Sequence, residues 1–179
     1  MTGQRRSIRL KDHDYATPGA YFVTICTASR RQMFRQPRFK GIVEGAWSEL
    51  TELFPAVVLD EMVIMPDHIH LLLRLLGASG SAAQGASRRA PTLADAVRAL
   101  KGNAARRINA LRGSPGAAVW QRNYYERVVR SEKELERVRE YITNNPLLAH
   151  EHARDDTSDA WRQRPRAPTG DQPIGYNGA

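Results

Sequence analysis

Cysteine, lysine and long apolar runs are scarce in this 179-residue chain. Cys26 is the only cysteine, which excludes an internal disulfide and a cysteine-rich zinc module. The longest largely apolar stretch, 69–76, is interrupted by His70 and Arg74 and is far too short to span a bilayer, so we expect no membrane partner. The opening stretch, MTGQRRSIRLKDHD, is charged and no apolar segment follows it, which predicts a cytoplasmic protein without a secretory signal.

Arginine supplies most of the positive charge. Only four of the 27 basic residues are lysines, and the net charge is +8. Residues 1–40 carry nine basic and two acidic side chains and residues 80–130 carry ten and two, so two basic blocks flank an acidic one. Because guanidinium groups bind phosphate through a planar fork of donors, this pattern favours a polyanionic partner. The alternative is that the arginines reflect genomic composition alone.

Apolar periodicity and turn residues predict the strands. They are expected at 21–27, 57–65, 68–76 and 124–130. The second and third should pair as a hairpin, because the Pro66-Asp67 turn lies between them.

Three helices are expected between the strands and after them. They are predicted at 42–54, at 93–111 and from Ser131 to about Asn145, where the following Pro146 should stop the last one. Capping-box spacings open the second and third, at Thr92-x-x-Asp95 and Ser131-x-x-Glu134. The order of elements predicts an α+β fold, an antiparallel sheet with helices packed on it.

Composition divides the chain into three parts. Residues 1–19 form a basic N-terminal arm, residues 20–150 a single domain and residues 151–179 a polar, proline-containing tail that we expect to be disordered. Residues 77–90 are small and polar, which predicts a flexible surface loop.

The sequence His68-Ile69-His70 lies in the predicted third strand. Side chains alternate along a strand, so both imidazoles share one face while apolar residues occupy the other. Two neighbouring histidines suit a metal ion, because two like cations do not tolerate burial together. Two hydrogen-bonded core histidines are the alternative interpretation.

Tyr141 and Asn145 are four residues apart and therefore lie on the same side of the last helix. A core-facing amide is costly unless its oxygen has a partner, and a metal ion would be one. Ordinary packing for the tyrosine and helix capping for the asparagine are the alternatives.

These residues complement one another chemically. Two imidazoles and an amide oxygen form an incomplete shell for a hard divalent cation, which leaves positions open for phosphate oxygens. A tyrosine beside that shell is a candidate nucleophile for covalent phosphoryl transfer. We therefore interpret Tyr141 as catalytic and His68, His70 and Asn145 as metal ligands.

The sequence resembles the REP-associated tyrosine transposases, which belong to the single-tyrosine HUH (IS200-like) superfamily. The resemblance runs from about Ser7 to Leu148, through SIRL, PGAYFVTICT, VIMPDHIHLLL, PTLADAVRALK and VWQRNYYERVVRSEKELERVREYITNNPL. The last block is highly specific. The HUH pair, two histidines around a hydrophobic residue, matches His68-Ile69-His70 as written.

This resemblance implies an RRM-like (ferredoxin-like) sheet, the HUH endonuclease fold, with the histidine pair on its central strand. Tyr141 matches the family nucleophile, and Asn145 stands where related insertion-sequence enzymes have glutamine. The implied activity is nicking and joining of single-stranded DNA at imperfect palindromic hairpins, as in DNA transposition. It uses Mg²⁺ or Mn²⁺ and a 5′-phosphotyrosine intermediate, and the enzyme works as a monomer or a homodimer.

Basic residues in the two positive blocks are the candidates for DNA contact. They are Arg5, Arg6 and Arg9 in the arm, Arg98, Lys101, Arg106 and Arg107 on the second helix, and Arg122 with Asn123 before the fourth strand. Tyr124 and Tyr125 are rival nucleophiles, although base stacking or packing is the preferred interpretation. The alternative functions are a non-catalytic protein that binds single-stranded DNA or RNA hairpins and a metallonuclease that uses activated water.

Overall fold

The computed structural model describes residues 17–77 and 91–152, with side chains as far as Asn145. Most of the predicted arm, the 77–90 loop and the tail fall outside these described residues. In the described ranges, four strands form one sheet: β1 (Gly19–Cys26), β2 (Val57–Met65), β3 (His68–Leu75) and β4 (Tyr125–Val129). All neighbours in the order β2-β3-β1-β4 are antiparallel. The predicted α+β class and the β2–β3 hairpin are therefore confirmed.

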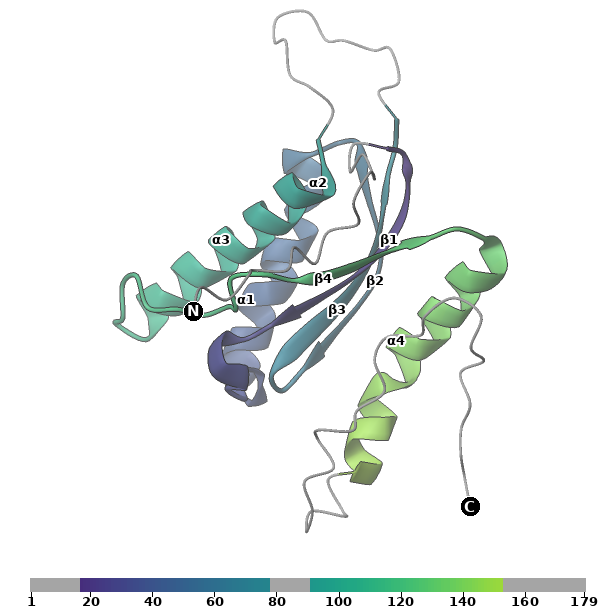
Figure 1. The fold of residues 1–179 in the computed structure, drawn as a ribbon. Coiled ribbons are helices and arrows are strands. Elements are labelled where there is room, and N and C mark those ends of the chain that lie inside the picture. Colours follow the sequence, from purple (N-terminus) through teal and green to yellow (C-terminus); the bar gives the residue numbers. More distant parts are fainter. Residues whose placement is uncertain (1–16, 78–90, 153–179) are drawn as a thin grey trace, which may run out of the picture.

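Helices cover the two faces of the sheet unequally (Figure 1). One face carries α1 (Pro37–Ser48), α2 (Leu50–Leu53) and α3 (Leu93–Leu111), and α4 (Glu132–His152) lies on the other. Two short 3-10 turns, η1 (Ala28–Arg30) and η2 (Met33–Arg35), follow β1. No described helix combines the length and the apolar character needed to cross a membrane.

The capping box predicted for α3 is present in full. Thr92 Oγ1 accepts a hydrogen bond from the backbone N–H of Asp95, and the Asp95 carboxylate accepts one from the backbone N–H of Thr92. At α4, Ser131 Oγ likewise accepts from the Glu134 N–H, but the Glu134 carboxylate accepts from the N–H of Arg130 rather than Ser131. Both helices therefore begin where their capping spacings indicate.

Two predicted helix boundaries were wrong. The helix predicted at 42–54 begins earlier, with Pro37 in its first turn, and is divided at Glu49 into α1 and α2. The last helix does not stop before Pro146 but continues to His152. An interior proline removes one backbone hydrogen bond and crowds the preceding turn, which a helix can absorb by bending as well as by ending.

Alternating residues of the two central strands build two separate cores. On the α1 and α3 side, the buried residues of β1 and β3 are Tyr21, Val23, Ile25, Ile69, Leu71, Leu73 and Leu75. On the other side, Phe22 and Leu72 pack against Leu135, Val138 and Ile142 of α4. Because β3 is apolar towards both layers, it is buried along nearly its whole length. Its two histidines lie on the α4 side, in step with Leu72.

A bidentate ion pair ties α4 to the sheet. Arg139 Nε and Nη2 donate to the two carboxylate oxygens of Asp60 at 2.9 and 2.8 Å. Asp60 lies where β2 bulges between Leu59 and Met62, and its side chain is only 8% exposed. Hydrogen bonding to Asp60 raises the pKa of Arg139 far above the neutral range, so this guanidinium stays charged. This ion pair holds α4 against the sheet at a point two residues before Tyr141.

Arg139→Gln should lower the free energy of unfolding by about 1.5–3 kcal/mol, because it leaves a buried carboxylate without its charged donor. Urea denaturation monitored by circular dichroism measures this change. Lys133→Gln, an exposed cation on the same helix, is the matched control and should change stability by less than about 0.5 kcal/mol. Equal stability of the Arg139 variant and the wild type would contradict a stabilising role for this ion pair.

Candidate functional site

The two histidines of β3 point their Nε2 atoms at each other. His68 and His70 are 6% and 4% exposed, and the two Nε2 atoms are 3.2 Å apart. Two bare nitrogen lone pairs at this distance repel one another, so a proton or a cation must lie between them. Two nitrogens bonded to one divalent ion at about 2.1 Å, roughly at right angles, are separated by about 3 Å. The pair therefore fits one metal ion.

Each ring is oriented through its Nδ1 atom. His68 Nδ1 lies 2.6 Å from the Asp67 carboxylate, which can only accept, so Nδ1 carries the proton and the neutral ring has its Nε2 lone pair free to bind a metal. His70 Nδ1 lies 2.8 Å from Thr24 Oγ1, and a hydroxyl can accept or donate. His70 can therefore hold its proton on Nε2, towards His68, or move it to Nδ1 when a metal binds.

Tyr141 reaches the same place from α4. Its ring centroid is 5.3 Å from that of His70 and 5.9 Å from that of Phe22, both in edge-on arrangements. Phe22 in turn stacks on His70, with the centroids 5.3 Å apart. Asn145 lies one turn beyond Tyr141 and is 9% exposed. The strand and the helix thus bring Tyr141 beside the histidine pair.

Imidazoles are the main metal-binding groups on this face. Within the described ranges, no group of three or more histidine, cysteine, aspartate and glutamate side chains gathers around one point. A third protein ligand would therefore come from another residue type, and the Asn145 amide is the ligand that the sequence predicts. Two nitrogens and an amide oxygen leave coordination positions open, as a catalytic site requires.

Asp67, Arg30 and Cys26 also belong to this site, although sequence reasoning did not select them. Asp67 was interpreted as a turn residue only, but a carboxylate directly before a His-x-His pair is a signal for ring orientation. Arg30 Nε lies 3.3 Å from the second Asp67 oxygen, and Nη1 donates to Cys26 Sγ at 2.9 Å. Burial raises the pKa of the Cys26 thiol, and the nearby Arg30 only partly opposes this effect.

The cations predicted on α3 lie in the opposite layer from the histidine pair. Lys101 Nζ donates to the carbonyls of Gln121 and Arg122 at 2.9 and 3.0 Å, and burial lowers its pKa. Arg107 Nη2 donates to both carboxylate oxygens of Glu49, at 2.8 and 3.0 Å. Both side chains therefore bind carbonyl or carboxylate groups of the protein itself, in addition to any contact that they make at the surface.

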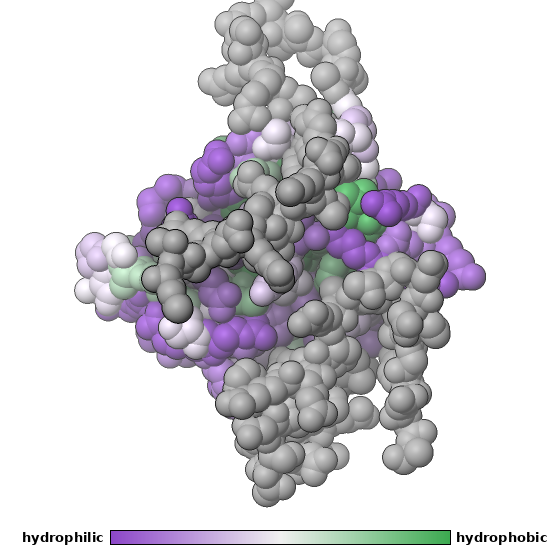
Figure 2. Space-filling model, viewed as in Figure 1, coloured by the Kyte–Doolittle hydropathy of each residue, from purple (hydrophilic) through white to green (hydrophobic). Residues whose placement is uncertain are grey.

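The other predicted DNA contacts differ in their surroundings. Arg98 is 75% exposed and pairs with Asp95, and Arg106 donates to Asn103 in the preceding turn. Arg122 and Asn123 are exposed just before β4. Arg5, Arg6 and Arg9 lie outside the described residues. In the view of Figure 2, hydrophilic residues dominate the described surface.

The two rival tyrosines face opposite ways. Tyr124 packs against the core beneath α1 and α3, with Lys101 Nζ 6.0 Å from its ring centroid. Tyr125 is 56% exposed and pairs in register with Thr24, whose hydroxyl contacts His70. Tyr125 therefore lies on the histidine face, one strand beyond Thr24.

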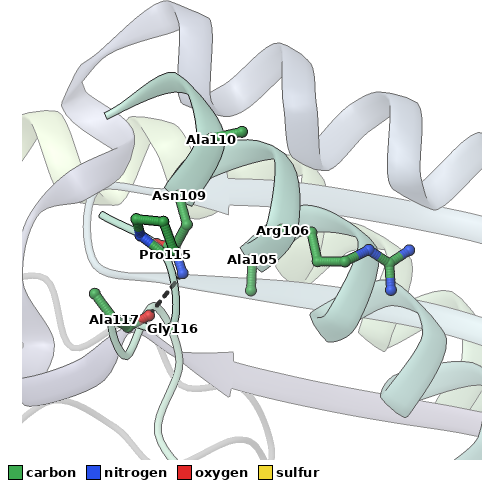
Figure 3. A pocket seen from close by; sticks show the side chains of 7 residues that line it. All are labelled: Ala105, Arg106, Asn109, Ala110, Pro115, Gly116 and Ala117. Carbon is green, nitrogen blue, oxygen red and sulfur yellow. Dashed lines mark hydrogen bonds between the residues drawn. The ribbon is translucent and has the colours of Figure 1, made fainter. Parts of the chain in front are cut away.

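A hollow of about 440 Å³ lies on the far layer, at the end of α3 (Figure 3). Its walls are mostly apolar, and Asn109 Nδ2 there donates to the Ala117 carbonyl at 2.9 Å. None of its lining residues belongs to the histidine face. The hollow is therefore separate from the candidate site.

The comparisons with known proteins agree with this architecture. No family model matches the chain. Among solved structures, that of a REP-associated tyrosine transposase bound to a REP hairpin superposes with a TM-score of 0.56 at 19% identity, over 83% of this chain and 74% of that one. A candidate transposase from Deinococcus radiodurans R1 superposes with a TM-score of 0.44 at 24% identity, over 76% of this chain and 97% of that one. The first match shows that the chain has the fold of a REP-associated tyrosine transposase.

A sequence relative defines the family. An uncharacterized protein of Haemophilus influenzae is 35% identical over 165 residues, covering 80% of this chain and 89% of that protein. The chain therefore belongs to the same protein family as this Haemophilus protein.

Proposed function

We propose that the protein is a metal-dependent single-stranded DNA endonuclease and strand transferase of the transposase type. It would act at palindromic hairpins through a covalent 5′-phosphotyrosine on Tyr141. The observation that carries this proposal is the convergence, within one chain, of the Tyr141 ring and two facing imidazole Nε2 atoms. The fold shared with a REP-associated tyrosine transposase, whose structure holds a REP hairpin, supports the choice of DNA.

The reaction is an exchange of phosphate esters. Tyr141 Oη loses its proton and attacks the phosphorus, so that a new O–P bond forms as the bond from phosphorus to the 3′ oxygen breaks. The 3′ oxygen leaves with a proton, and the strand downstream of the cut stays on the tyrosine through its 5′ phosphate. Because one diester replaces another, the energy of the broken bond is kept, and a 3′-hydroxyl can reverse the step on a new strand.

His68 and His70 would hold the metal through Nε2, with the Asn145 amide as the expected third ligand. A bound Mg²⁺ or Mn²⁺ supplies Lewis-acid polarisation of the phosphate and neutralises charge that develops during attack. Asp67 and Thr24 keep the two rings turned towards the ion. Phe22 contacts the rings of both His70 and Tyr141 and so limits the space in which the phenol can move.

Tyr141 is a better nucleophile candidate than its rivals. Tyr124 packs in the opposite core and cannot reach the histidine face without unfolding β4. Tyr125 is on the correct face but belongs to β4, which is separated from the histidine strand by β1. At about 4.8 Å between neighbouring strands, its Cα lies roughly 10 Å from the histidine strand.

Tyr141→Phe should abolish a covalent protein–DNA adduct while leaving DNA binding unchanged, because only the nucleophilic oxygen is removed. The assay uses 3′-labelled single-stranded hairpins from the DNA flanking the gene, Mn²⁺, and denaturing gel electrophoresis. EDTA, His68→Ala and His70→Ala should also prevent the adduct. Tyr124→Phe is the matched control and should form the adduct as the wild type does.

Two results would contradict this scheme. Cleavage by Tyr141→Phe at the wild-type rate would favour activated water as the nucleophile. A wild-type protein that binds hairpins but does not cut them, with binding indifferent to both histidine substitutions, would favour a non-catalytic hairpin-binding protein.

Tyr125→Ala should weaken binding of a fluorescent single-stranded hairpin about tenfold in EDTA, because a base stacked on an exposed ring contributes about 1–3 kcal/mol. Fluorescence anisotropy measures the dissociation constant. The slope of log affinity against log salt should not change, since stacking releases no counterions. Tyr125→Phe should bind as the wild type does, and Leu53→Ala, an equally exposed apolar residue on α2, is the control. Unchanged binding by Tyr125→Ala would rule out this stacking contact.

A further inference from the structure

A chain of polar contacts reaches His68 from the segment after β1. The Arg30 guanidinium lies 3.3 Å from one oxygen of Asp67, and the other oxygen lies 2.6 Å from His68 Nδ1. The same guanidinium donates to Cys26 Sγ, and Cys26 pairs in register with His68. Arg30 therefore contacts two immediate neighbours of one histidine, although its own side chain is 44% exposed.

The backbone at this point is unusual. Ser29 and Arg30 both have positive φ, at 55° and 54°, in the left-handed region that residues other than glycine rarely adopt. Such backbone persists only where the surroundings enforce it, and it is frequent at functional sites. Here it turns the chain back over the β2–β3 turn, which carries Asp67.

Buried hydrogen bonds hold the segment against that turn. Thr27 is fully buried, and its backbone N–H donates to the Asp67 carbonyl at 2.9 Å. The Thr27 hydroxyl lies 2.7 Å from the Arg31 carbonyl and 3.0 Å from that of Asp67. Arg31 Nη2 donates to the Ala118 carbonyl at 2.6 Å. Both ends of the contact between Arg30 and Asp67 are therefore fixed by the backbone.

We infer that Arg30 is a positioning residue for the histidine pair and acts through Asp67. A carboxylate held at one oxygen by a guanidinium presents its other oxygen in a fixed direction, which fixes the proton of His68 on Nδ1 and leaves Nε2 bare. Outer contacts of this kind change metal affinity without touching the metal. This inference rests on the proposed function, because the histidine pair is taken as the metal site.

The test measures Mn²⁺ binding to the full chain by isothermal titration calorimetry, without DNA and at constant pH. Asp67→Asn should weaken binding about 10–100-fold, as is typical when an outer contact of a metal-bound histidine is lost. Arg30→Gln should weaken it several-fold, and Arg30→Lys less. The double variant should bind no more weakly than Asp67→Asn alone, because the arginine acts only through that carboxylate.

Two control variants separate this effect from damage to the fold. Ser29→Gly keeps the left-handed backbone without its side-chain strain and should bind Mn²⁺ as the wild type does. Arg35→Gln removes an exposed guanidinium nearby whose Nε donates to Gln32, and it should also have no effect. Wild-type affinity in Arg30→Gln, or effects of Arg30→Gln and Asp67→Asn that add in the double variant, would overturn the inference.

A second measurement needs no metal. Long-range proton–nitrogen NMR spectra of the metal-free protein should find the His68 proton on Nδ1 in the wild type. In Arg30→Gln the proton should be shared between both nitrogens, because a carboxylate that the guanidinium no longer holds can turn away from the ring. An unchanged His68 tautomer in this variant would overturn the inference even if the wild type bound no Mn²⁺. Failure of the wild type to bind Mn²⁺ would instead count against the proposed function.

Discussion

The two imidazole nitrogens that face each other at 3.2 Å are the constraint on which the site depends. Buried and almost without solvent, they need a proton or a cation between them. The groups that contact the two Nδ1 atoms restrict the positions of the ring protons differently. Asp67 allows only one tautomer of His68, whereas the Thr24 hydroxyl allows either tautomer of His70. The pair can thus be satisfied by a proton on His70 and converted to two metal-binding nitrogens by moving that proton.

The sheet and α4 make this pair useful for chemistry. The antiparallel order places β3 in the interior of the sheet, and the alternation of side chains sends both histidines towards the face on which α4 is the one helix among the described residues. The apolar residues of α4 pack into the core on that face, and the bidentate ion pair between Arg139 and Asp60 holds the helix in place close to Tyr141. The candidate nucleophile and the candidate metal ligands therefore meet on one face of the sheet.

Local patterns in the sequence were sufficient for much of this fold. Strand alternation gave the correct face for His68 and His70, and the Thr92 and Ser131 spacings gave the start of each helix. These features depend on residues close together in the chain. The course of α4 past Pro146 was missed because proline weakens a helix without always ending it.

Contacts between distant residues could not be predicted in the same way. Arg139 and Asp60 are 79 positions apart, and Arg30 reaches Asp67 only because two residues adopt left-handed backbone. Lys101 and Arg107 look like surface cations in the sequence, yet they bind carbonyl and carboxylate groups of the fold. The charge pattern indicates that a polyanion is a suitable partner, but it does not identify which guanidinium groups remain available to it.

The central claim is that the phenol and the imidazoles of one chain form one site. Mixing two inactive proteins, Tyr141→Phe and His68→Ala, tests it most directly in the adduct assay. Each chain then lacks one half of the site, and only exchange of α4 between chains could restore a complete one. The account predicts no adduct from the mixture at any ratio, with the wild type active alongside. An adduct on the chain that carries His68→Ala would contradict it.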